Sequence, residues 1–501
     1  MTLAIVRRLR DNLLGSIDIT QLEDKVIAHP IFQRLRRIKQ TAFLSFVFTG
    51  ASHSRFEHSL GVMHLAEKSW EKIKDNQMRL GKIRPLPCAK GGARSLWTPK
   101  IAANFPLLEE IFASDYIFQT LRLAALLHDV GHPSYSHSGE RYLPTLGEIL
   151  RANPEMPVYL RDFFAEKQAS NQAEGKDALP VRHEYFSVLL IDRILREVYT
   201  SNPELSLKIA AQDVISVLIP EIEPLPHSEL VRLKANKLCN ELVSGEIDID
   251  RMDYLLRDSR ECGVIYGQFD RERILDSLGI YFDEEEQSLH LAIQLSGLAA
   301  YEDYLRARQS MYLQLYFHKT SVACEAMLQR LHELVPGFAL PAALSAYVMV
   351  DDARMVDLLR EANAQSRMSA QVKAEAEVLI MDLFYNRRLW KRVYECSSLA
   401  QGEDRSKNIE RAKEVLRGEG LVVEHLSSTN YLTNVGARSK GKLRNYLKLI
   451  KKDEITGMRI EDIEDYSQLY KIDHGVRIER LYVSSEESLR AKAALQRSFA
   501  D

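Results

Sequence analysis

A mostly aliphatic run from Leu121 to Leu127 leads directly into the polar pair His128-Asp129, and Gly131 follows. Such a run predicts a buried helix, and a carboxylate at its end is costly unless a positive charge or a metal ion compensates it. Neighbouring residues on a helix point ~100° apart, so both side chains reach one ion most easily where the helix ends. A bare His-Asp pair is more often a surface pair, but the aliphatic context favours a buried site.

Two other segments carry ligands that the same ion would accept. His58 precedes the His-Asp pair in the chain, and the segment 247–254 contains three aspartates that can supply a closing carboxylate. Two imidazoles and two carboxylates form a mixed nitrogen and oxygen set that suits Mn, Fe, Mg, Ni or Zn. The residues therefore predict one divalent metal ion as cofactor and hydrolytic chemistry.

Three further histidines lie in or near these motifs. His132 stands four residues after His128, His137 follows in the same stretch, and His183 can add another imidazole. Histidine titrates near neutral pH, so a protonated imidazole beside a metal-bound phosphate can donate a proton to a leaving oxygen. The alternative is that some of these histidines only make structural hydrogen bonds.

The segment around residue 250 combines acidic, basic and aromatic side chains at helical spacing. Asp250, Tyr254 and Asp258 recur every four residues, and Arg251 lies one turn before Tyr254. One helix face can thus present a metal ligand beside groups that bind anions, which suits a metal-bound phosphate chain. Taken alone, such a run is more often a solvated charged helix.

Bulk properties exclude several classes of protein. The 501 residues are 46% hydrophobic and 27% charged, as in ordinary globular chains of two to four domains. The five cysteines form no C-x-x-C pair, which argues against a disulfide framework and a zinc ribbon. A net charge of −3 gives no overall attraction to nucleic acid. Without an apolar run near the ~20 residues that cross a bilayer, we expect a cytoplasmic protein with no membrane partner.

Helical periodicity dominates the chain, so we expect a mainly α fold. A helical domain is expected at 1–335, with surface insertions at about 81–100 and 165–182. A smaller α+β domain, regulatory or oligomerising, is expected at 336–501.

Strand signals are few. Residues 279–293 predict a hairpin around an acidic turn, and residues 475–483 predict a half-exposed edge strand followed by a charged helix. The segment 418–432 is also strand-like in composition. The basic segment 438–452 is interpreted as a solvated helix face, and the alternative is that it binds effector phosphates or single-stranded nucleic acid.

Several of these motifs, in this order, closely resemble those of the HD-domain deoxynucleoside triphosphate (dNTP) triphosphohydrolases. The resemblance spans roughly residues 1–335, and the ordered set is more specific than any single motif. It implies an HD-domain helical core and a homo-oligomer, either a dimer or a tetramer. The segments that carry the resemblance are 10–40, 55–65, 126–137, 183–184, 245–258 and 306–319.

The resemblance also implies a role for each candidate residue. The metal ligands are His58, His128, Asp129 and Asp250. The catalytic group is His132, His137 and His183, and His137 protonates the departing 5′ oxygen. The residues that grip the phosphates are Arg55, Arg251 and Tyr254. The residues that face the sugar are Gln40, Asp258 and Tyr316. The candidates for a nucleotide effector site between subunits are Gln33 and Arg36.

In that family, a water activated by the ion attacks the α-phosphorus of a dNTP and releases deoxynucleoside and intact triphosphate. Charge neutralisation by metal and arginines supplies most of the barrier reduction. The chain departs from the family at two places. It has Thr41-Ala42 where relatives commonly have Leu-Gly, and Ile27 to Pro30 lack the aspartate of relatives activated by guanine nucleotides. Discrimination against ribose and activation by guanine nucleotides therefore do not follow from the resemblance.

Two other functions are compatible with the same motifs. One is an HD-type phosphodiesterase or nuclease, and the other is a sensor that binds a nucleotide or nucleic acid without turnover. A product that is triphosphate rather than monophosphate separates the first from a triphosphohydrolase. The intact histidine group argues against the second, because a sensor has no need of proton donors.

Overall fold

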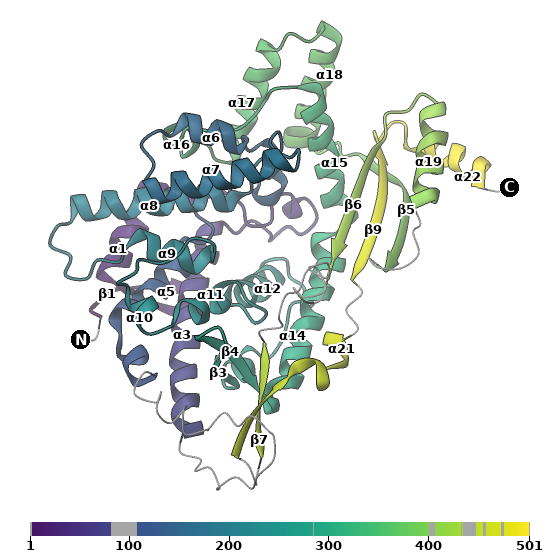
Figure 1. Ribbon diagram of the computed structural model, residues 1–501. Coiled ribbons are helices and arrows are strands. Elements are labelled where there is room, and N and C mark those ends of the chain that lie inside the picture. Colours follow the sequence, from purple (N-terminus) through teal and green to yellow (C-terminus); the bar gives the residue numbers. More distant parts are fainter. Residues whose placement is uncertain are drawn as a thin grey trace.

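The computed structural model describes residues 3–81, 108–283, 285–399, 406–431, 433, 447–453, 457–471 and 475–499. Helices predominate, which confirms the predicted mainly α fold with a smaller α+β region (Figure 1). No helix within these ranges is both long enough and apolar enough to cross a membrane. The predicted insertion at 81–100 lies outside the described residues from position 82 onward.

Helices make up most of the chain, and short strands stand between them. The helices of the first part are α1 (Gln21–Ala28), α2 (Pro30–Gln33), α3 (Arg55–Gly81), α5 (Asp115–Leu127), α6 (Leu146–Ala152), α7 (Val158–Ala173), α8 (His183–Ser201), α9 (Ala211–Leu218), α10 (Glu229–Arg232), α11 (Asn236–Ser244), α12 (Ile249–Glu261) and α13 (Arg271–Leu275). The later helices are α14 (Leu298–Met311), α15 (Lys319–Leu334), α16 (Leu344–Tyr347), α17 (Asp352–Gln365), α18 (Ala370–Met381), α19 (Ser406–Gly418), α21 (Gln468–Lys471) and α22 (Ser488–Phe499). The strands are β1 (Ile5–Asp11), β2 (Gly15–Thr20), β3 (Leu278–Asp283), β4 (Ser288–Gln294), β5 (Lys391–Leu399), β6 (Glu424–Asn430), β7 (Lys448–Asp453), β8 (Gly457–Asp462) and β9 (Val476–Val483).

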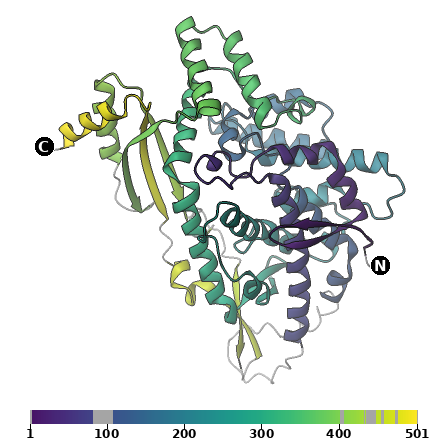
Figure 2. The same cartoon turned by 180° about the vertical axis from the view of Figure 1, so that it is seen from behind.

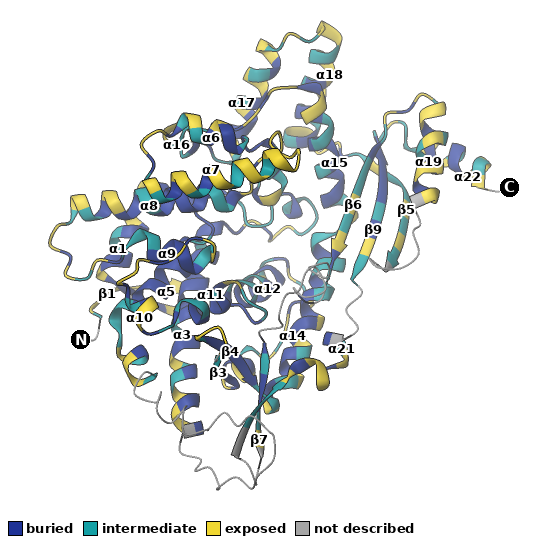
Figure 3. Ribbon diagram, viewed as in Figure 1, coloured by how far each residue is buried: buried dark blue, intermediate teal, exposed yellow. Residues whose placement is uncertain are grey.

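Helix α5 forms as the aliphatic run predicts. The Ser114 side chain caps it by accepting a hydrogen bond from the backbone N–H of Ile117, and its residues from Leu121 to Leu127 are all buried. The helix ends at Leu127, so His128 and Asp129 stand at its carboxyl end. Figure 3 shows that α3, α5 and α12 carry long buried stretches at the centre of the molecule.

The described strands form three small sheets. The hairpin predicted at 279–293 is confirmed as the antiparallel pair β3 and β4. Strand β7 then pairs with β4 in parallel, so one four-stranded sheet, in the order β3-β4-β7-β8, joins residues before and after position 335. The second sheet, β5-β9-β6, packs against α15, away from the helical part (Figures 1 and 2).

The structure corrects three expectations. The strand at 476–483 is the central strand of its sheet, not an edge, because alternating apolar and charged residues report a solvated face and say nothing about the strand's neighbours. Residues 448–452 are part of a strand rather than a helix face, since Leu449 and Ile450 are buried between the lysines. Helix α7 continues to Ala173, inside the insertion predicted at 165–182, because its last turns are polar and hide the helical period.

A buried ion network ties the amino-terminal elements to α5. The Arg122 side chain is 1% exposed, and its Nε lies 2.7 Å from Glu23 Oε1 on α1. Its Nη1 lies 2.5 Å from Glu67 Oε2 on α3, and its Nη2 donates to the backbone carbonyl of Asp18 on β2 at 2.7 Å. One guanidinium therefore holds four elements together.

We predict that Arg122→Gln destabilises the fold, because it leaves the buried carboxylate of Glu23 and the partly buried carboxylate of Glu67 without their cation. The expected loss is about 3–5 kcal/mol in the free energy of unfolding, measured by urea titration. The control is Arg193→Gln, which removes an exposed pair with Glu197 on α8 and should change the same quantity by at most about 1 kcal/mol. Equal losses in the two variants would contradict the prediction.

Candidate active site

Three helices bring four of the predicted residues to one point. His58 projects from the first turn of α3, His128 and Asp129 follow α5, and Asp250 lies in the first turn of α12. His58 Nε2 lies 3.0 Å from Asp250 Oδ1 and 3.6 Å from Asp129 Oδ2. His128 Nε2 lies 3.6 Å and 3.4 Å from the same two oxygens. A nitrogen or oxygen atom of His58, of His128 and of Asp129 lies within 4.8 Å of the other two, close enough to share an ion.

The two imidazoles are oriented as metal ligands require. His58 Nδ1 lies 2.9 Å from Asp253 Oδ2, and His128 Nδ1 lies 2.8 Å from the backbone carbonyl of Ala125. Both Nε2 atoms are buried, and neither makes a hydrogen bond of acceptable geometry with the described residues. Because Nδ1–H donates to an oxygen, each Nε2 keeps a lone pair for a cation. The residues present thus fit a divalent metal ion.

The electrostatics of this point are set by its carboxylates. Burial opposes a charge on His58, but the carboxylates of Asp250 and Asp253 raise the pKa of this imidazole to about 9. Burial likewise opposes ionisation of Asp129, yet the Arg55 guanidinium beside it, with His128 and His132, holds the pKa of that carboxyl well below its usual range. Arg55 Nη1 contacts Asp129 Oδ2, and its Nε donates to Ser136 Oγ at 2.9 Å. Because Asp129 and Asp250 are ionised, a cation bound between them would be stabilised.

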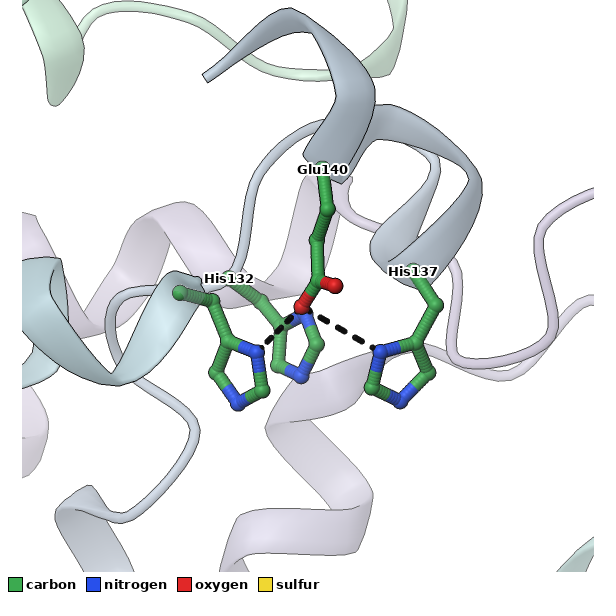
Figure 4. Close-up of side chains that lie close together, drawn as sticks. His132, His137 and Glu140 are labelled. Atoms are coloured by element: carbon green, nitrogen blue, oxygen red, sulfur yellow. Dashed lines mark hydrogen bonds and ion pairs between the residues drawn. The ribbon is translucent and has the colours of Figure 1, made fainter. Parts of the chain in front are cut away.

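A second group of side chains adjoins the first. One ligand atom from each of His132, His137, Glu140 and His183 lies within 4.8 Å of the others. Figure 4 shows the His132 and His137 rings beside the Glu140 carboxylate. Glu140 Oε1 lies 2.5 Å from His183 Nδ1 and 3.3 Å from His137 Nδ1. His132 and His183 stack with ring centroids 3.6 Å apart. Glu140 therefore orients two of the three predicted proton carriers.

Asp129 joins the two groups. Its Oδ2 faces His58 and His128, while its Oδ1 lies 3.3 Å from His132 Nε2 and 3.9 Å from His183 Nε2. Burial lowers the pKa of His132, and the Arg55 and His183 charges lower it further, so this ring stays neutral. His137 is the most exposed of the three rings and is the one best placed to meet a ligand from solvent.

These groups open into one pocket of about 660 Å³, large enough for a nucleotide. His58 lies behind the lining, buried. The residues from the sequence prediction that line the pocket are Gln40, Arg55, His128, Asp129, His132, His137, His183, Asp250, Tyr254, Asp258 and Tyr316. Burial raises the pKa of Tyr254 and of Tyr316 well above its usual value, so both phenols are neutral.

Three predicted residues lie elsewhere. The Arg251 guanidinium contacts Asp248 and the Gly245 carbonyl and does not line the pocket, so a phosphate contact would require it to move. Gln33 and Arg36 hydrogen-bond to each other outside the pocket, with Arg36 Nε donating to Gln33 Oε1 at 2.9 Å. Their roles stay predictions.

The structure adds residues that sequence reasoning missed. Glu140 is three residues after His137, a spacing that signals a shared face, but the motif offered no reason to select it. His53 lies 2.7 Å from Asp258 Oδ1, while Tyr316 donates to Asp258 Oδ2 at 2.7 Å. Ser427, Ser428 and Thr429 of β6 also line the pocket, and nothing in their sequence indicates it.

The fold and the site together define a helical protein whose pocket is lined by paired histidine and aspartate side chains. A family model described as "HD associated region" matches residues 269–419. The chain is 31% identical over 306 residues to the uncharacterized protein YwfO of Bacillus subtilis, which covers 60% of this chain and 49% of that protein. It is 25% identical over 332 residues to human deoxynucleoside triphosphate triphosphohydrolase SAMHD1. This match covers 64% of this chain and 43% of the human protein.

A crystal structure of a hypothetical protein from Aquifex aeolicus has the same fold. Its TM-score is 0.63 at 21% sequence identity, and the match covers 98% of this chain and 99% of that one. The chain spans about half the length of the curated relatives it matches. The chain thus resembles HD-domain proteins in the family-model match at residues 269–419, and it resembles human SAMHD1 over 64% of its own length.

The environment of Glu140 predicts how stability depends on pH. Burial alone would raise the pKa of Glu140, but hydrogen bonds from His137 and His183 hold that pKa well below its usual value. A carboxyl with a depressed pKa stabilises the fold above its unfolded-state pKa of about 4.3, and this contribution is lost as the pH falls toward the folded-state value. Below about pH 4.3, the melting temperature of the wild type should therefore fall more steeply than that of Glu140→Gln. Thermal unfolding in a chelating buffer measures both curves, and parallel curves would contradict the assignment.

Proposed function

We propose that this protein is a metal-dependent hydrolase that converts deoxynucleoside triphosphates to deoxynucleoside and triphosphate. The observation that carries the proposal is the pair of buried imidazole Nε2 atoms facing two carboxylates, beside a histidine group in the same pocket. The relatives named as deoxynucleoside triphosphate triphosphohydrolases support it.

We assign the metal to His58, His128, Asp129 and Asp250. When bound there, a divalent ion polarises a phosphoryl oxygen and lowers the pKa of a coordinated water. Arg55 reaches the same place with a fixed cation, since its guanidinium contacts Asp129 and lines the pocket. It therefore neutralises charge that develops on the α-phosphate. Arg251 is proposed to join it after a change of rotamer.

The histidine group handles the proton. His137 holds its Nδ1 toward Glu140, which leaves Nε2 to carry a proton to the departing 5′ oxygen. Glu140 orients that ring through Nδ1, and burial keeps the adjacent His132 neutral. Tyr254, Tyr316, Asp258 and Gln40 also line the pocket. In this proposal the Tyr254 hydroxyl donates a hydrogen bond to a phosphate oxygen. Asp258 and Gln40 accept hydrogen bonds from the sugar hydroxyl.

One observation favours a second candidate. The ligand atoms of His132, His137, Glu140 and His183 lie close enough together to hold a metal ion, and Asp129 lies between this group and the first. Paired metal ions are used by nucleases. A nuclease or phosphodiesterase of that kind would bind two ions and release monophosphate.

The first test is product analysis. Purified protein with Mn or Mg should release triphosphate and deoxynucleoside from at least one dNTP, because hydrolysis at the α-phosphorus leaves the phosphate chain intact. Chromatography of the four dNTPs, separately and mixed, measures this, and faster turnover in the mixture indicates a nucleotide effector. Absence of triphosphate under all these conditions refutes the proposal, and monophosphate favours the second candidate.

Variants separate metal binding from proton transfer. His128→Ala and Asp129→Ala should lose both the metal and hydrolysis, because each removes a ligand. His137→Ala should keep the metal while turnover falls by roughly 10²–10⁴-fold, as expected for loss of a general acid. Elemental analysis beside activity measures both quantities. Retained metal in the first two variants would show that the ligands are misassigned.

A further inference from the structure

A chain of charged contacts starts at the candidate metal ligand His58 and runs away from the pocket. The first link is Asp253 on α12, whose Oδ2 lies 2.9 Å from His58 Nδ1. The Asp253 side chain is fully buried and does not line the pocket, so it cannot serve a substrate directly. It accepts from the imidazole nitrogen that faces away from the ion and so fixes the tautomer of His58.

The second link is Arg257, one turn further along α12. Its Nε donates to Asp253 Oδ2 at 2.8 Å and its Nη2 donates to Asp253 Oδ1 at 2.9 Å, a bidentate pair. The guanidinium is also buried, so it keeps Asp253 ionised and fixed in orientation. A third donor, Nη1, points elsewhere.

The third link is Asp11, the last residue of β1. Its Oδ2 accepts from Arg257 Nη1 at 2.9 Å, while its Oδ1 accepts from the backbone N–H groups of Leu13 and Leu14 at 2.8 Å each. The same carboxylate therefore closes the turn between β1 and β2 and anchors Arg257. The tip of the amino-terminal hairpin is in this way connected to the His58 ring.

Close packing against α3 restricts the positions of the Asp253 and Arg257 side chains. Gly61 lies one turn after His58 on α3, and a Cβ atom there would sit 2.0 Å from Asp253 Oδ1 and 2.5 Å from Arg257 Nη2. Any other residue at this position would force the Asp253–Arg257 pair to shift away from α3. The buried side chains from His58 to Asp11 alternate in charge, and close packing keeps them in this one set of contacts.

We infer that Asp11, Arg257 and Asp253 are positioning residues that set the affinity of the site for its metal ion, and that the β1–β2 hairpin is therefore part of the metal site. The inference rests on the proposed metal ligands. Asp253 fixes the orientation of the His58 ring, Arg257 holds Asp253, and Asp11 holds Arg257. Loss of the Asp11 charge leaves Arg257 Nη1 without this partner. The Asp253 carboxylate and the His58 imidazole are then held less firmly.

The test compares metal affinity across matched variants of the 501-residue chain. Asp11→Asn keeps an oxygen for the turn but removes the charge that faces Arg257. Asp253→Asn removes the inner link. The control is Asp18→Asn, the same change on the same hairpin, where the side chain forms an ion pair with exposed Arg8. Protein stripped with a chelator is titrated with Mn²⁺, free Mn²⁺ is measured by its electron paramagnetic resonance signal, and melting temperatures are recorded without metal.

The dissociation constant for Mn²⁺ should rise by about 10–100-fold in Asp253→Asn, as for other partners of metal-binding histidines, and by about 3–10-fold in Asp11→Asn. It should be unchanged in Asp18→Asn. Arg257→Lys, which keeps the charge but loses the bidentate pair, should lie between the first two. Equal constants in Asp11→Asn and the control, with Mn²⁺ bound by the wild type, overturn the inference and leave the proposed function standing. A wild type that binds no Mn²⁺ or other divalent ion overturns both.

Discussion

The structure depends on placing buried carboxylates where imidazoles and one guanidinium can compensate them. Asp129 stands at the end of an aliphatic helix, where an uncompensated charge would cost several kcal/mol. Arg55 and His58 of α3 and His128 at the end of α5 lie close to it, and Asp250 of α12 lies close to the same two imidazoles. The same three helices carry the Asp253–Arg257 pair and, through Arg122, the contacts to the amino-terminal elements. The same charged side chains therefore hold the helices together and form the candidate active site.

The site also separates two tasks that a phosphate hydrolase must perform together. One oxygen of Asp129 faces the imidazoles that fit a metal ion, and the other faces the histidines grouped around Glu140. Positive charge for the attacked phosphate and a proton for the leaving oxygen can then be supplied within one pocket, on opposite sides of a single carboxylate. Of the histidines around Glu140, His132 is kept neutral by burial and His137 is the one most exposed to solvent.

Much of this could be predicted from sequence where the signal was local. The helix at 121–127, its end at His128 and the hairpin at 279–293 follow from periodicity and turn residues, and the order of motifs along the chain indicated the family. Contacts between distant segments could not be predicted in the same way. Glu140 and His53 belong to the site because they contact His183 and Asp258, which are distant in sequence. The central position of β9 and the strand at 448–453 depend on pairing partners, which alternation and charge do not encode.

The parallel pairing of β4 with β7 has a consequence for how this protein can be divided. Residues 448–450 satisfy the backbone groups along one edge of β4, a strand that follows the helical core in sequence. A fragment that stops near residue 335 would expose that edge as a template for intermolecular strand addition, and it would aggregate rather than report the behaviour of an isolated domain. Deletion analysis of the carboxy-terminal region therefore needs a substitute strand or charged substitutions along β4 before any change in activity can be attributed to the residues removed.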